Sequence, residues 1–198
     1  MPDKTRIAAA IAVLQSMDPD RDEYKELLAG LNRRVDPRKP FKTPLFDSIT
    51  LLSWSIAFEA VWIRERGGRI WVYLRKRSLF DTAYAGLRHA AGTAARPGEG
   101  KEAMNTLDVI SRRLAKAEFG VEGGFSSYHF VENFFNPREE RGSFLSIIFL
   151  VDFDRDVPPG ETGEWFPVDQ LPENMVPSHR DVINPKAFAA WRLLKEQG

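Results

Sequence analysis

Two apolar stripes near the start of the chain predict two helices between residues 5 and 34. The first stripe has three residues at helical spacing, and the second has four at positions i, i+3, i+4 and i+7. They are Ile7, Ile11 and Leu14, followed by Tyr24, Leu27, Leu28 and Leu31. Asp18 is expected to cap the second helix, because Pro19 suits a first helical position. These apolar stripes are expected to pack either on the main domain of the same chain or against a second copy of the chain in a dimer.

A basic, proline-rich segment follows the predicted helices and divides the chain. Residues 36–44 contain three prolines, which rules out a helix there. We therefore predict an N-terminal helical extension with its connector in residues 1–40, and a main domain in residues 45–198.

Alternating and continuous apolar runs predict a sheet in the main domain. Ser55–Glu65 has the composition of a strand, Gly67-Gly68 is a hairpin turn signal, and Arg69–Arg77 alternates. Further strands are expected at Phe125–Phe135, Ser143–Phe153 and Glu164–Phe166. Residues 78–100 are predicted to be mostly loop, and residues 136–142 a polar loop.

Two helical patterns lie among and after these strands. Glu102–Phe119 has one apolar stripe, with Gly120 as a natural residue after its C-terminus. The stripe consists of Leu107, Ile110, Leu114 and Ala117. Asn184-Pro185 begins a C-terminal helix whose apolar side carries Phe188, Trp191 and Leu194. Interspersed strands and helices predict an α/β (α+β) fold, in which helices cover both faces of a mixed sheet.

Composition excludes several function classes. The 198 residues carry 28 Lys and Arg against 28 Asp and Glu, so binding to extended nucleic acid is not expected. The absence of cysteine excludes disulfides, cysteine-ligated metals and thiol nucleophiles, and fits a cytoplasmic location. No apolar run is long enough for a membrane span. The N-terminal run Ile7–Leu14 is read as a helix, because no cleavage site for a signal peptide follows it.

Most catalytic templates are missing from the sequence. There is no phosphate-binding loop, no dinucleotide fingerprint, no H-E-x-x-H and no G-x-S-x-G. The three histidines, His89, His129 and His179, show no spacing typical of metal ligands, and we interpret each as structural or exposed.

The stretch Gly86–Val121 contains the main functional signal. A strand ending in Arg precedes a glycine-rich loop with Gly-Glu, and a helix with Arg-Arg-Leu, Glu and Gly follows. This order resembles the signature of Nudix hydrolases. VYLRKR at Val72–Arg77, YAGLRHAAG at Tyr84–Gly92 and GEWFPVDQLP at Gly163–Pro172 are similar to other segments of that family. The resemblance spans residues 55 to about 195 and implies a Nudix-like α/β/α sandwich with a central mixed sheet.

The resemblance also implies a site. It suggests Glu118 and Glu99 as catalytic residues, with Asp108 and Glu102 completing the ligands of Mg²⁺ or Mn²⁺. Arg77, Arg113 and Glu164 are the implied substrate-binding residues. The implied reaction is attack of metal-activated water on a diphosphate bond of a nucleoside diphosphate linked to another group. A homodimer is also common in the family.

This chain departs from the family pattern inside the signature. Leu114 and Ala117 stand where two helical glutamates belong, and the spacing from Gly92 to Glu99 is one residue too long. Asp108 and Glu118 are ten residues apart, about 80° out of alignment on a straight helix. Each of the carboxylates has an alternative interpretation as a solvated surface group, and Arg75 is expected to form an ion pair.

Two functions therefore stay open. The first is a metal-dependent hydrolase that acts on a small-molecule diphosphate. The second is a catalytically impaired Nudix-fold module that binds a nucleotide or a protein partner. Aromatic residues could stack a base, but Phe134 is expected in the core, and Trp165 is left undecided. A third interpretation, an unrelated α/β fold, would make both matching segments coincidences.

Overall fold

The chain forms two compact units, Met1–Lys39 and Pro40–Gly198. The computed structural model describes residues 4–34, 54–81, 83–95, 106–139, 142–154 and 163–197. No helix in these ranges is both long and apolar enough to cross a membrane.

The first unit contains the two predicted helices, α1 (Lys4–Ser16) and α2 (Asp22–Asn32). The predicted cap of α2 is wrong, because the helix begins at Asp22 and follows Arg21. The Asp18 carboxylate instead accepts the backbone N–H of Asp20 at 3.0 Å, which closes a turn ahead of the helix.

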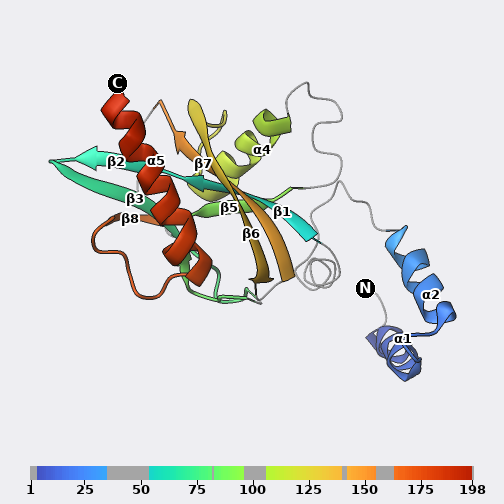
Figure 1. Cartoon of the computed structure of the whole chain (residues 1–198). Helices are drawn as coiled ribbons and strands as arrows, with labels where there is room; N and C mark the ends of the chain where they lie inside the picture. Colours follow the sequence, from blue (N-terminus) through green and yellow to red (C-terminus); the bar gives the residue numbers. More distant parts are fainter. Residues whose placement is uncertain are drawn as a thin grey trace. The chain divides into compact units, whose positions relative to one another are not determined.

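The second unit is built on two four-stranded sheets (Figure 1). The first has the order β5-β1-β7-β6, with β1 and β7 parallel and the other neighbours antiparallel. Its strands are β1 (Trp54–Val61), β5 (Ala91–Ala94), β6 (Ser127–Glu139) and β7 (Gly142–Asp152). In the second sheet, β3 pairs antiparallel with each of the other strands. Its strands are β2 (Ile63–Arg66), β3 (Arg69–Lys76), β4 (Arg88–His89) and β8 (Gly163–Pro167).

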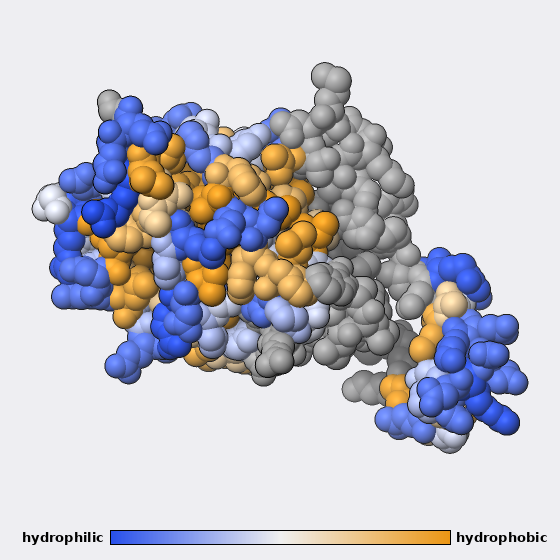
Figure 2. All heavy atoms as spheres, in the orientation of Figure 1, coloured by the Kyte–Doolittle hydropathy of each residue, from blue (hydrophilic) through white to orange (hydrophobic). Residues whose placement is uncertain are grey.

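Helices cover both sides of the strands, as predicted. α4 (Thr106–Leu114) continues into the π-helical turn η1 (Ala115–Phe119), and η2 (His179–Ile183) leads into α5 (Asn184–Gln197). Figure 1 shows α5 crossing the near side of the strands. Figure 2 shows apolar side chains gathered across the middle of this face, with hydrophilic side chains at its left and lower edges.

Two hydrophobic clusters fill the space between the helices and the sheets. Ala60 packs in the cluster that contains Leu114 of α4, whereas its neighbour Val61 packs with Ala187 of α5. Adjacent residues of a strand point to opposite faces, so the strands lie between two helical layers. The predicted α/β/α sandwich with a central mixed sheet is confirmed.

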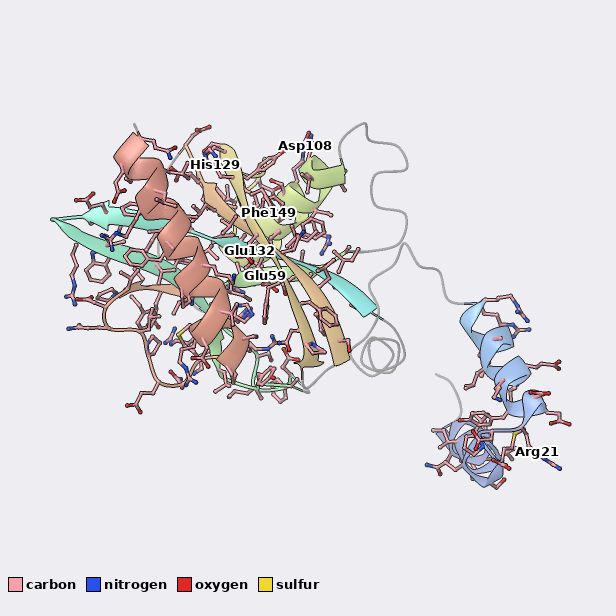
Figure 3. The ribbon with its side chains drawn as sticks, viewed as in Figure 1. Arg21, Glu59, Asp108, His129, Glu132 and Phe149 are labelled. Atoms are coloured by element: carbon pink, nitrogen blue, oxygen red, sulfur yellow. The ribbon has the colours of Figure 1, made fainter. Side chains whose placement is uncertain are left out.

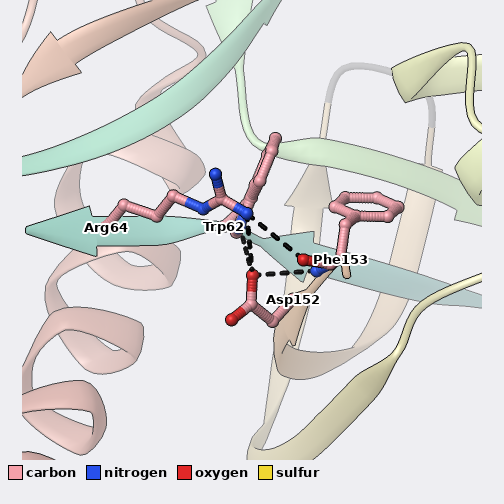
Figure 4. A network of polar contacts seen from close by, with 4 residues as sticks. All are labelled: Trp62, Arg64, Asp152 and Phe153. Carbon is pink, nitrogen blue, oxygen red and sulfur yellow. Dashed lines mark hydrogen bonds and ion pairs between the residues drawn. The ribbon is translucent and has the colours of Figure 1, made fainter. Parts of the chain in front are cut away.

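Trp62 marks the point where the chain passes from the first sheet to the second. Its side chain is completely buried, and its indole N–H donates to Asp152 Oδ1 at 3.0 Å (Figure 4). The same oxygen accepts the backbone N–H of Phe153 at 2.8 Å and contacts Arg64 Nη2 at 3.3 Å. This crossing splits the predicted strand Ser55–Glu65 into β1 and β2.

Two predicted loops contain strands. Residues 78–100 include β4 and β5, and the predicted loop 136–142 is shortened because β6 continues to Glu139. The pairing register shifts between Asn136 and Glu139, around Pro137, which an edge strand tolerates at such an irregularity. The Gly67-Gly68 turn is confirmed, since both residues have positive φ angles of 60° and 73°.

Side-chain burial tests the predicted core positions near the C-terminus. Phe188 and Trp191 pack against the α5 cluster, but Leu194 is exposed, and Ala187 takes the fully buried position. Phe134 is partly buried against the same cluster, as predicted. Trp165 packs in the aromatic core, with its ring centroid 4.6 Å from that of Trp62.

Candidate anion-binding site

The helix of the signature ends in a π-helical turn that sets which residues face inward. α4 is α-helical to Leu114, and η1 then runs to Phe119. The next residue, Gly120, has a φ of 67°, the left-handed conformation expected after a helix. The wider turn changes the register of the apolar stripe. Ala115 and Phe119 are buried there, whereas Ala117 is exposed, so its predicted place in the stripe is wrong.

Glu118 lies on this turn and pairs with an arginine of the second sheet. Its Oε2 is 3.3 Å from Nε of Arg75, and the two side chains are only 23% and 20% exposed. Burial raises the pKa of the Glu118 carboxyl above its ordinary value, while Arg75, Arg77 and Arg113 act in the opposite direction. The expected ion pair of Arg75 is therefore present.

Two of the other six implied site residues, Arg77 and Arg113, are thus within electrostatic range of Glu118. The three arginines, Arg75 included, come from two parts of the fold. Arg75 is on β3, Arg77 directly follows that strand, and Arg113 is in the last turn of α4.

Two of these arginines are held by neighbouring groups. Arg77 donates through Nε and Nη2 to Asp81 Oδ2, at 3.1 and 2.8 Å. Arg113 donates to Thr93 Oγ1 and, at 3.0 Å, to the carbonyl oxygen of Ala94, which ties α4 to β5.

Arg75 differs from the other two. Its Nε is buried and has no hydrogen-bond partner among the described residues, because the contact with Glu118 is an ion pair without hydrogen-bond geometry. A buried donor without an acceptor is costly in a folded protein.

Two of the other implied site residues, Asp108 and Glu164, lie away from Glu118. Asp108 is in the first turn of α4, ten residues and about 15 Å of helical rise away (Figure 3). Glu164 pairs with Leu74 across β8 and β3, whereas its neighbour Gly163 pairs with Arg75. Glu164 therefore faces the opposite side of the sheet, where Arg88 Nη2 contacts it at 3.1 Å. Glu99 and Glu102 lie outside the described residues.

The described residues do not fit a magnesium site. Mg²⁺ needs a set of oxygen ligands in octahedral geometry. Across the described ranges, no group of three His, Asp or Glu side chains could hold a metal ion. Glu118 is already paired with Arg75, and two further guanidinium groups act on it, so the local charge opposes a divalent cation.

A buried polar cluster on the other face of β1 was not predicted. Glu59 of β1 is 6% exposed and accepts a hydrogen bond from the Ser146 hydroxyl at 3.2 Å (Figure 3). Its Oε2 is 3.9 Å from Nε2 of His179, whose Nδ1 accepts the backbone N–H of Ala90 at 3.2 Å. Burial lowers the pKa of His179 to about 3, so its imidazole is neutral.

Gly92 makes room for this cluster, since a Cβ atom there would lie 2.2 Å from Glu59 Oε2. One signal in the sequence pointed to the cluster: Glu59 is a lone charge within an otherwise apolar run. The cluster lies on the α5 side of the sheet, because Glu59 is next to Ala60, which faces α4. We interpret this cluster as a structural feature of the fold, separate from the site around Glu118.

Comparisons with solved structures identify the fold of the second unit. NrtR of Shewanella oneidensis superposes with a TM-score of 0.54 at 16% identity, over 70% of this chain and 64% of that one. This chain thus spans slightly less than two thirds of the length of NrtR. A MutT/nudix family protein of Listeria innocua gives a TM-score of 0.55 at 18% identity, over 75% of this chain and 99% of that one.

The Nudix domain of NrtR complexed with ADP ribose has a TM-score of 0.51 at 17% identity, over 83% of this chain and 97% of that one. NrtR has also been crystallised with a 27mer DNA. No protein-family profile and no curated protein matches the sequence. The structural likenesses show that the chain has the Nudix fold, as the resemblance implied.

Proposed function

We propose that this domain binds a nucleoside diphosphate linked to another group, and that arginines neutralise the diphosphate without a metal ion. The observation that carries the proposal is the buried Nε of Arg75, which lacks a hydrogen-bond acceptor among the described residues and is surrounded by further positive charge. Arg77 and Arg113 supply that charge.

Guanidinium groups suit this ligand chemically. They stay protonated at physiological pH and present N–H groups in a fixed fork that matches phosphate oxygens. Among the described residues named here, three guanidinium groups stand against two carboxylates, those of Glu118 and Asp81. The positive charge of these guanidinium groups takes the neutralising role that divalent cations have in Nudix hydrolases.

The helix beside the arginines also offers an apolar surface. A pocket between α4 and the first sheet is lined by Phe58, Phe149 and Leu114, and none of the three arginines is among its lining residues. Pockets that combine apolar walls with a few polar groups are typical small-molecule sites. ADP ribose, bound by the Nudix domain of NrtR, belongs to the proposed ligand class.

The test is equilibrium binding of ADP ribose and ADP to the full chain in buffer with EDTA. We expect both to bind, and Arg75→Gln to weaken binding about tenfold or more, because a charged hydrogen bond contributes about 1.5–3 kcal/mol. Arg69→Gln is the matched control, since Arg69 is at the other end of β3 and pairs with Asp169 at 3.0 Å. Equal losses in the two variants, or no binding to the wild type, would refute the proposal.

Metal-dependent hydrolysis is the second candidate. It is favoured by the position of Glu118, two residues before a Gly120 whose left-handed backbone matches the end of the signature helix. It would need Glu99 and Glu102 to supply the missing carboxylates for Mg²⁺ or Mn²⁺. This candidate predicts Mn²⁺-dependent cleavage of ADP ribose that Glu118→Ala abolishes, whereas the first predicts no cleavage by either protein.

A further inference from the structure

We propose that Glu118 is a built-in counter-anion: its carboxylate takes the place of a ligand phosphate at Arg75, and a diphosphate must displace it to bind. This inference rests on the proposed function and concerns how the same site is controlled. It gives Glu118 a role opposite to that of a metal ligand, since the carboxylate would then oppose ligand binding.

The geometry of the Glu118–Arg75 ion pair is consistent with a carboxylate that a ligand displaces. Oε2 of Glu118 is 3.3 Å from Arg75 Nε, close enough for charge pairing, yet the pair makes no hydrogen bond. A phosphate oxygen could approach the same nitrogen in line and form one, because an oxyanion is the acceptor that guanidinium groups bind best.

Displacement of Glu118 would leave the two neighbouring arginines, Arg77 and Arg113, in place. Arg77 is held by Asp81, and Arg113 by Thr93 and Ala94, so their positions do not depend on Glu118. Arg75 differs, because Glu118 is the one carboxylate that contacts it among the described residues.

The position of Glu118 also suits a movable group. It lies on η1, a π-helical turn one residue from the bend at Phe119-Gly120, and the turn itself is fixed by buried Ala115 and Phe119. The side chain can therefore rotate away while the backbone stays packed.

The first experiment measures ADP binding by calorimetry in EDTA for the wild type and for Glu118→Gln. The amide keeps the shape of the side chain but removes its negative charge, so we expect the affinity to rise about tenfold, as the competing ion pair and its repulsion of phosphate are lost. Glu122→Gln is the matched control, because Glu122 is an exposed carboxylate two residues beyond Gly120 that pairs with Lys116. It should leave the affinity unchanged.

A double-mutant cycle tests whether the gain passes through Arg75. In the Arg75→Gln background, Glu118→Gln should no longer raise the affinity, because the nitrogen that the carboxylate occupies is gone. Glu118→Ala serves as a second variant, with a gain in the same direction, and thermal unfolding of each variant verifies that it is folded.

The outcomes separate this inference from the proposed function. If the wild type binds ADP and Glu118→Gln binds it equally or less tightly, the counter-anion role is refuted and the arginine site stands. A gain that persists in the Arg75→Gln background also refutes it. If neither the wild type nor Glu118→Gln binds ADP in EDTA, both proposals fail. ADP binding that appears in Glu118→Gln alone also overturns both proposals, because the wild type would then have a carboxylate that diphosphate cannot displace and no ligand at its arginines.

Discussion

Replacing Asp152 with alanine removes an acceptor that serves three donors at the crossing between the two sheets. The buried indole N–H of Trp62 donates to Asp152 Oδ1 at 3.0 Å, and the backbone N–H of Phe153 donates to it at 2.8 Å. Arg64 contributes an ion pair at 3.3 Å, with the Asp152 side chain 57% exposed. The site matters for function because Trp62 also packs against Phe119, next to Glu118, with ring centroids 5.9 Å apart.

The size of the effect follows from the burial of each donor. A completely buried indole N–H left without a partner costs about 1–3 kcal/mol, and the loss of the Phe153 hydrogen bond adds about 1 kcal/mol. The exposed ion pair with Arg64 adds less than about 1 kcal/mol. Asp152→Ala should therefore lower the free energy of unfolding by about 2–5 kcal/mol in total.

Asp152→Asn is the matched control, because the amide keeps an acceptor oxygen for Trp62 and Phe153 and loses the charge that Arg64 uses. It should cost less than about 1 kcal/mol. Urea unfolding, followed by tryptophan fluorescence and far-UV circular dichroism, measures both variants. If the alanine variant is no less stable than the asparagine variant, the hydrogen bonds to Asp152 do not stabilise this crossing.

Three further outcomes are expected. Gly163→Ala should lower the free energy of unfolding by about 1–3 kcal/mol in urea titrations, because its Cβ would lie 1.9 Å from the buried Tyr73 hydroxyl. Burial lowers the pKa of His179 from 6.5 to about 3, so between these values the unfolded chain binds a proton that the folded chain does not. Stability should then fall by about 1.4 kcal/mol per pH unit below pH 6.5, and His179→Gln should remove that part of the slope. Millimolar Mg²⁺ should leave the melting temperature of the ligand-free protein unchanged, whereas a Mg²⁺-dependent rise would favour a metal site near Glu118.

The layered fold was predictable because its strands and helices have clear periodicities. The continuous run of β7 and the alternation in β3 are strong signals, and the order of the partial Nudix segments predicted the architecture. β5 was missed because Ala91–Ala94 has small residues with weak strand preference. It becomes a strand by pairing with β1, a contact between residues far apart in the sequence.

The candidate site was predictable only in part. The signature helix indicated Glu118 and Arg113, but a straight-helix register cannot anticipate a π-helical turn, which moved Ala117 outward. The face of the sheet on which Glu164 lies depends on the pairing register of β8 with β3. In this register Glu164 forms an ion pair with Arg88. The sequence likewise does not show that Arg75, whose ion pair was expected, would keep a buried nitrogen without an acceptor among the described residues.

The most direct test of this account is a titration of the wild-type chain with ADP ribose, first in EDTA and then in Mg²⁺, with the products analysed after each. We predict binding in EDTA, no gain in affinity with Mg²⁺, and intact ADP ribose in both samples. Binding that requires Mg²⁺ and ends in cleavage of the diphosphate bond would contradict the account, and would show that this fold retains a working metal site.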